Sequence, residues 1–189
     1  MKTSGIKQKR EIRVNQSTIL CSTPINKNSA FKNAIVLITR YNSYGTTGII
    51  LNSPLDSIVH LNDVHNLRNE IPLNFGGPDD NLLSFLVSIP SLPDGIRTST
   101  YWSRNSNDLM LLMKLINADE VLINAYKGSM QWFPGDLEEE ISNGLWWATD
   151  EYSIDQIFED RSEIYLKIAK QISGHYAPLL EADIPINYN

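Results

Sequence analysis

The stretch QWFPGDLEEEI, residues 131–141, brings four carboxylates into five positions directly behind a tryptophan, a proline and a glycine. Pro134 suits the first position of a helix, where its missing N–H would have no partner. The acids that follow then fall beside the positive end of the helix dipole. Leu137 and Ile141 supply a stripe for burial, and Asn143-Gly144 is a typical C-terminal stop. The stretch predicts a short capped helix that begins at Pro134 and anchors a sheet.

The same carboxylates raise the alternative of a catalytic acid/base cluster. Catalysis by paired carboxylates needs two groups aimed at one substrate atom, with pKa values pushed apart by burial. At 100° per residue, Glu138, Glu139 and Glu140 fan across the polar face of the predicted helix and do not converge. We therefore interpret the stretch as a helix start.

Runs of β-branched and apolar residues predict strands elsewhere in the chain. These runs cover residues 17–25, 31–41, 46–52, 71–80, 82–90, 95–103 and 120–128. The turn-rich YNSYG between the second and third runs predicts a hairpin. Helical spacing of apolar residues predicts helices over 106–117 and 163–173, and 58–70 fits a short helix or an irregular crossing.

This order of elements predicts an α+β fold and not the regular alternation of a doubly wound sheet. A chain of 189 residues suits one compact domain. We expect that domain to span residues 17–189, behind a flexible basic tail over residues 1–16.

Charge is unevenly spread along the chain. Residues 1–14 hold five of the 16 basic residues and one of the 22 acidic ones, so the remainder has 11 basic and 21 acidic residues and a net charge of −10. Binding to phosphate backbones needs a positive footprint, so nucleic acid is disfavoured as a partner. The basic tail fits either a solvated end or a contact with an acidic partner.

Other composition features exclude several classes of site. No apolar run is long enough to span a bilayer, and the N-terminus lacks the apolar segment of a signal peptide, so we expect a cytoplasmic protein. Cys21 is the only cysteine and sits in an apolar run, which predicts a buried residue. His60 and His65 are poorly spaced for zinc, and no metal or cofactor is predicted.

Three ordered blocks resemble the YqgE/AlgH family of bacterial proteins. GSMQWFPGDLEEEI looks like the family's G-Y-x-G-W-x-P-G-Q-L-E-x-E signature, AFKNAIVLITRYNSYGTTGIILNSPL is similar to its N-terminal strand-turn-strand block, and FGGPDDNLLSFL resembles its G-G-P segment. The resemblance implies a single α+β domain with a bent, mostly antiparallel, pseudo-barrel β-sheet and a few flanking helices. It implies no established activity, although one member is labelled a transcriptional regulator.

This sequence departs from the family pattern at several polar positions. Ser129 and Gln131 replace a tyrosine and a glycine before the tryptophan, and Asp136 replaces a glutamine. Val87 or Ser88 stands where relatives commonly have a histidine. If those positions build a ligand site in relatives, the site is altered here.

The three blocks together supply the candidate binding surface. Its residues are Asn52, Gly76, Gly77, Pro78, Trp132 and Gly135. The alternative reading of the same residues is that they form turns and sheet corners. Trp146 and Trp147 point to opposite faces of a strand, and the outward one is either a contact surface or part of the packing.

The leading hypothesis is a non-catalytic cytoplasmic protein that binds a protein or small-molecule partner, with a regulatory role. One alternative is a transcriptional regulator, which fits the family label but not the charge. The other is an enzyme of hydrolase type, with a site that no motif in the sequence reveals.

Overall fold

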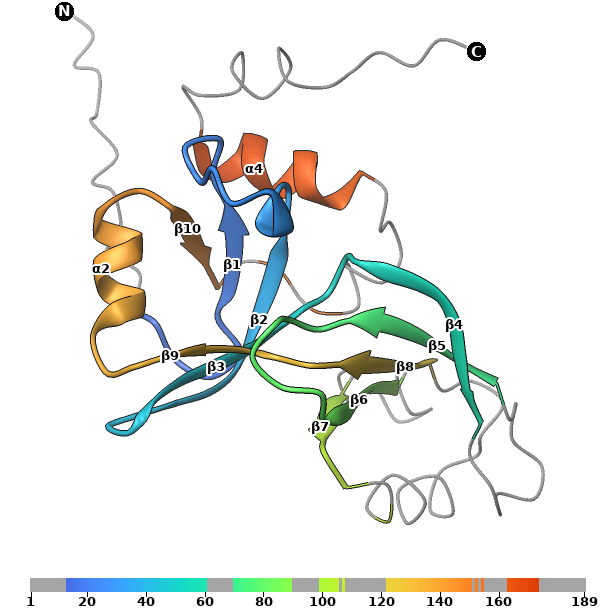
Figure 1. Ribbon diagram of the computed structural model, residues 1–189. Coiled ribbons are helices and arrows are strands. Elements are labelled where there is room, and N and C mark those ends of the chain that lie inside the picture. Colours follow the sequence, from blue (N-terminus) through green and yellow to red (C-terminus); the bar gives the residue numbers. More distant parts are fainter. Residues whose placement is uncertain are drawn as a thin grey trace, which may run out of the picture.

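The strands of this protein form two five-stranded sheets that do not close into a barrel. The computed structural model describes residues 13–60, 70–89, 99–105, 107, 122–150, 152, 154 and 163–173. Figure 1 shows the two sheets side by side, with two labelled helices against the first of them. The predicted α+β fold with mostly antiparallel strands is confirmed, with the bent sheet divided in two.

The first sheet is antiparallel throughout and has the strand order β10-β1-β2-β3-β9. Its strands are β1 (Ile19–Ser22), β2 (Ile35–Asn42), β3 (Gly45–Ile50), β9 (Met130–Trp132) and β10 (Trp146–Thr149). A short 3-10 helix, η1 (Ser29–Phe31), precedes β2. The predicted hairpin is the β2–β3 pair, whose last paired residues are Asn42 and Gly45.

The second sheet has the strand order β4-β5-β8-β6-β7. Its strands are β4 (Pro54–His60), β5 (Glu70–Phe75), β6 (Leu83–Ile89), β7 (Ser99–Ser103) and β8 (Leu122–Lys127). Strands β5 and β8 pair in parallel, whereas the other neighbours are antiparallel. The β8 strand therefore reaches its neighbours only after a long excursion of the chain.

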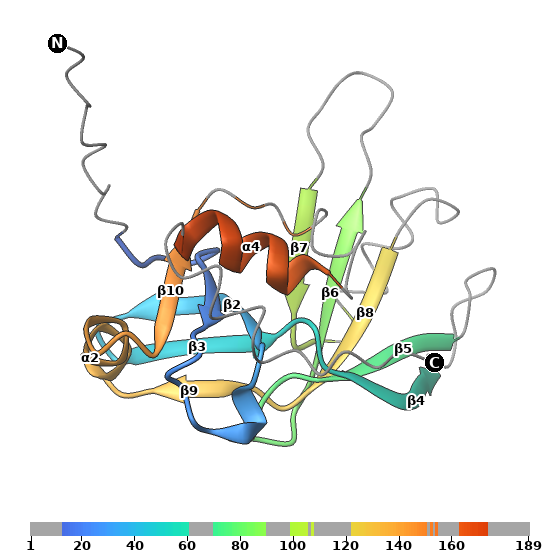
Figure 2. The same ribbon diagram turned by 90° about the horizontal axis from the view of Figure 1, so that it is seen from above.

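The first sheet is buried on both faces, which explains its continuous apolar runs. On β1 and β2, Ile19, Ile35 and Leu37 face the cluster that contains Ile168 of α4 (Ile164–Ser173). Their neighbours along each strand face a second cluster, which contains Leu137 of α2 (Asp136–Ser142). The two helices thus cover opposite faces of one sheet (Figures 1 and 2).

The adjacent tryptophans of β10 follow this two-faced burial. Trp146 belongs to the cluster under α2 and is 2 % exposed, and Trp147 is half-buried against the cluster under α4. Packing is therefore the correct reading of both rings, and Trp147 is not an outward contact surface.

The structure corrects the sequence reading at two places and leaves others outside its description. Residues 58–60 belong to β4, because Ile58 pairs with Pro72, so no helix begins at residue 58. The helix after Pro134 begins at Asp136, because Gly135 adopts φ 93° and takes the capping position. Residues 61–69 and most of the helix predicted over 106–117 lie outside the described residues.

The N-terminal tail and the domain limits stay predictions. Residues 1–12 lie outside the described residues, whereas Val14 packs against the cluster under α2. Within the described part of the chain, no helix is long and apolar enough to cross a membrane.

Candidate functional site

The three family blocks meet where the chain passes from one sheet to the other. We call this place the sheet junction (residues 50–53, 75–77 and 127–129). There the Ile50 amide donates to the Gly76 carbonyl at 2.8 Å, and the Gly76 amide donates to the Lys127 carbonyl at 2.7 Å. The Phe75 amide donates to the Ser53 carbonyl at 2.8 Å. The blocks come together as a backbone crossing, with their hydrogen-bonding groups used by one another.

Glycine is required at this junction because the backbones touch. A Cβ on Gly76 would lie 2.4 Å from the Gly128 carbonyl oxygen, and one on Gly77 would lie 2.3 Å from the Ser129 carbonyl carbon. Gly77 also adopts φ 149°. Both glycines are buried, and Pro78 begins the exposed turn that follows. The structure therefore gives Gly76 and Gly77 an architectural role.

Asn52 works as a clamp on the entry to β2. Its Oδ1 accepts from the Ile35 amide at 2.8 Å, and its Nδ2 donates to the Asn33 carbonyl at 2.8 Å. Asn33 itself adopts φ 58°, a conformation that asparagine tolerates better than most residues. Both functional groups of the Asn52 amide thus serve the fold.

Trp132 is held in the core by one of the glutamates of α2. Glu140 Oε2 accepts from Trp132 Nε1 at 2.9 Å and from Trp146 Nε1 at 2.6 Å. The two indole rings meet edge to face, with centroids 6.3 Å apart. The prediction that all three glutamates fan over a polar face is therefore wrong for Glu140. It lies only 60° from Leu137 around the helix, which brings it to the edge of the buried stripe.

A polar network ties the Gly-Gly-Pro turn to β9. The Asp80 carboxylate accepts from the Ser129 hydroxyl at 2.6 Å, from Arg104 Nη2 at 3.1 Å and from the Leu82 amide at 3.0 Å. The Arg104 guanidinium lies 5.8 Å from the centroid of the Trp102 ring. Burial acts to raise the pKa of Asp80, but the bonds from Ser129 and Leu82 and the charge of Arg104 outweigh it and hold that pKa below its ordinary value of 3.8.

We expect Asp80→Asn to destabilise the protein in a pH-dependent way. A folded-state pKa below the ordinary one means that the ionised carboxylate stabilises the fold above that ordinary value and ceases to do so as the pH falls. At pH 7 the free energy of unfolding should drop by about 1 kcal/mol. Urea unfolding at a series of pH values should show the gap to the wild type closing below pH 3.8. A gap that stays constant from pH 7 to pH 3 would contradict this assignment.

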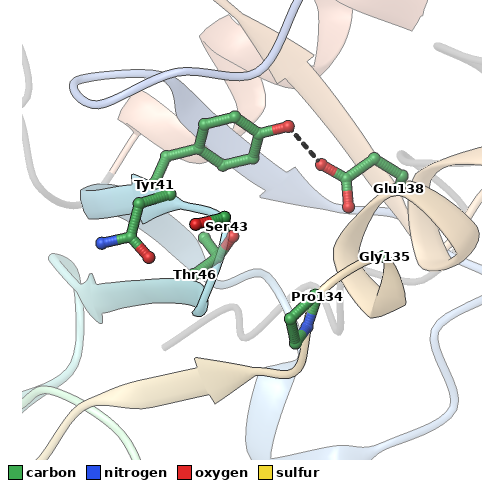
Figure 3. A pocket seen from close by; sticks show the side chains of 7 residues that line it. Tyr41, Ser43, Thr46, Pro134, Gly135 and Glu138 are labelled. Carbon is green, nitrogen blue, oxygen red and sulfur yellow. Dashed lines mark hydrogen bonds between the residues drawn. The ribbon is translucent and has the colours of Figure 1, made fainter.

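A surface groove lies between the tip of the β2–β3 hairpin and the start of α2. We call it the hairpin groove, and its volume is about 450 Å³. It is lined by Tyr41, Asn42, Ser43, Thr46, Pro134, Gly135 and Glu138. Figure 3 shows the Tyr41 hydroxyl pointing across to Glu138, where it donates to Oε1 at 2.6 Å. This hydrogen bond, with burial and the charge of the same carboxylate, raises the pKa of Tyr41 above its ordinary value.

The hairpin and the β9–α2 turn are brought together by strand pairing and by a glycine. Thr46 pairs with Trp132, and a Cβ on Gly45 would lie 2.5 Å from the Trp132 carbonyl oxygen. Gly45 adopts φ 127°. Because no side chain stands between them, the tip of the hairpin lies directly against the chain that leads into Pro134.

Aromatic rings are exposed next to this groove. Tyr44, at the hairpin tip, is 90 % exposed, Phe133, before Pro134, is 80 % exposed, and Tyr41 in the wall is 42 % exposed. Of the six predicted surface residues, Gly135 alone lines the groove, and binding at the other five stays a prediction. The sequence signal for the groove was the pair of tyrosines in a polar turn, which we had interpreted only as a hairpin.

The described residues offer little else for catalysis. Cys21 is fully buried, as predicted, and burial raises the pKa of its thiol, so it is not a ready nucleophile. No group of three or more His, Cys, Asp or Glu in the described part of the chain is placed to hold a metal ion. His65 and His175 lie outside that part.

Comparison with known proteins identifies the family. The family model described as AlgH-like (DUF179) matches residues 19–177. The chain belongs to the AlgH-like family. A UPF0301 protein of Chlamydia felis is 30 % identical to it over 175 residues, which are 87 % of this chain and 89 % of that one. A UPF0301 protein of Chlorobium phaeobacteroides is 30 % identical over 153 residues, which are 78 % and 81 % of the two chains.

Solved structures share the AlgH-like fold. The solution structure of AlgH from Pseudomonas aeruginosa has a TM-score of 0.60 and 21 % identity, over 98 % of this chain and 99 % of that one. The crystal structure of a protein from Corynebacterium diphtheriae has a TM-score of 0.59 and 17 % identity, over 85 % and 88 %. The resemblance predicted from the three sequence blocks is therefore confirmed, and at these identities the structures speak for the fold alone.

Proposed function

We propose that this AlgH-like protein is a cytoplasmic binding protein, not an enzyme, and that it holds a partner at the hairpin groove. The observation that carries the proposal is the combination of an open groove with exposed aromatic rings on both of its sides. Tyrosine and other large rings bury much area at little entropic cost, and they are enriched where proteins bind partners.

The chemistry around the groove supports binding more than reaction. The groove wall holds one tyrosine–carboxylate hydrogen bond, and Asn52, Trp132, Glu140 and Asp80 are engaged in holding the fold. A partner-binding protein without its own chemistry is suited to a regulatory role. Direct DNA binding at this surface is disfavoured, because the exposed carboxylates of α2 would repel phosphates.

Site-specific photocrosslinking in the cells that naturally make the protein tests this proposal. Benzoylphenylalanine in place of Tyr44 or of Phe133 should yield the same discrete cross-linked species, since both positions border one groove. Leu122 on β8, which is 54 % exposed, provides a matched control that should not yield that species. Absence of any cross-link at both groove positions, or the same products at all three, would overturn the assignment.

A further inference from the structure

Resting on the proposed function, we infer that the partner is a polypeptide segment that presents an arginine to the hairpin groove. The guanidinium would sit against the Glu138 carboxylate and stack on an exposed ring of Tyr41, Tyr44 or Phe133. The groove and its rings define the site, and the charge of Glu138 selects the occupant.

Glu138 has acceptor capacity to spare and is held in place to use it. Its Oε1 accepts from the Tyr41 hydroxyl at 2.6 Å, which fixes the carboxylate on the groove wall (Figure 3). A carboxylate has about four acceptor positions, and one neutral donor leaves its charge uncompensated. Among the described residues, the ion pair between Arg104 and Asp80 is the one observed, and none involves Glu138. A cationic side chain entering the groove would meet an oriented anion.

The exposed rings favour arginine over lysine. A planar guanidinium can stack on an aromatic face while it donates two parallel N–H groups to a carboxylate, whereas an ammonium cannot do both. This protein already holds one arginine in that way. Arg104 lies 5.8 Å from the Trp102 ring centroid and 3.1 Å from the Asp80 carboxylate. The hairpin groove offers the same pair of contacts with the arginine missing.

The rest of the groove suits a peptide rather than a free cation. Asn42, Ser43 and Thr46 line one side with groups that can hydrogen-bond to peptide amides, and Pro134 and Gly135 present an apolar floor. Asp136 and Glu139, both exposed, extend the negative field around the groove. The net charge of −6 also favours encounter with a basic partner.

An NMR titration with short peptides tests this inference. The probe is the blocked pentapeptide Gly-Ser-Arg-Ser-Gly, and its control carries citrulline, the uncharged isostere of arginine, at the central position. With the arginine peptide at 150 mM salt, saturable shifts should appear in the amides of residues 41–46 and 135–138. A complex this small should have a Kd of about 1 mM. The citrulline peptide should not saturate.

Two neighbouring substitutions separate a specific site from general acidity. Glu138→Gln should weaken binding of the arginine peptide by about tenfold, the loss of one charge-assisted contact. Glu139→Gln, which removes an equal charge one residue away and outside the groove, should stay within about twofold of the wild type. Equal binding of the citrulline peptide, equal losses in both variants, or shifts confined to another surface would overturn the inference.

The outcomes also distinguish this inference from the proposal beneath it. If Tyr44 and Phe133 cross-link a partner while the arginine peptide does not bind, the groove is a binding surface and the inferred chemistry of the partner is wrong. If neither experiment gives a positive result, the binding function itself fails.

Discussion

Replacing Gly128 by alanine should unfold most of the protein at room temperature. A Cβ there would lie 2.1 Å from the Gly77 carbonyl oxygen and 2.8 Å from that of Asp80, and both atoms belong to the backbone of the sheet junction. Gly128 also adopts φ 82°. Conformational strain and overpacking together should cost about 3–5 kcal/mol, which is a large part of the stability of an ordinary domain.

Gly135→Ala provides the matched control for this experiment. Gly135 has a similar φ of 93°, but a Cβ there would have no atom within 4 Å. Its cost should be that of the left-handed conformation alone, about 1–2 kcal/mol. Urea unfolding followed by tryptophan fluorescence measures both variants. Equal destabilisation of the two would mean that the crossing does not limit the fold.

Glu140→Ala should be the second most damaging change, with a loss of about 2–4 kcal/mol. The substitution leaves two indole N–H groups without their acceptor, on Trp132 at 7 % exposure and on Trp146 at 2 %. Each orphaned donor keeps the desolvation cost of its burial and loses the bond that offset it. Thermal unfolding and the free energy of unfolding in urea both report this loss.

Two companion variants make the result specific to the indole bonds. Glu139→Ala removes an exposed carboxylate from the same helix and should change the free energy of unfolding by less than about 0.5 kcal/mol. Glu140→Gln keeps a neutral acceptor and should lie between Glu139→Ala and Glu140→Ala. If Glu140→Ala is no worse than Glu139→Ala, the shared acceptor does not hold the tryptophans.

Local patterns in the sequence predicted the strands well, because each reflects a local property of the chain. The runs that become β1, β2, β3, β6 and β8 are rich in apolar and β-branched residues, and the YNSYG turn marks its hairpin. The strand β4 was missed, because its exposed Asp56 and Ser57 break the apolar pattern. The division into two sheets depends on the parallel pairing of β5 with β8, residues about 50 apart in the chain, and no short stretch encodes it.

The candidate site shows a different limit. Asn52, Gly76 and Gly77 stand out in sequence blocks, but a glycine that permits a backbone crossing looks the same in sequence as one that cradles a ligand. The groove joins residues 41–46 to residues 134–138, and only the Thr46–Trp132 register brings them together. By contrast, the inward position of Glu140 was predictable, since its angle to Leu137 follows from helix geometry.

The seven-residue helix α2 carries Glu138 at the groove and Glu140 at the paired indoles. Two residues on a helix are separated by about 3 Å of rise, so neither carboxylate can shift without the other. An occupant that draws Glu138 outward must therefore stretch the contacts of Trp132 and Trp146. The protein's own ultraviolet emission becomes a label-free gauge of groove occupancy, built into it by one short turn-and-a-half of backbone.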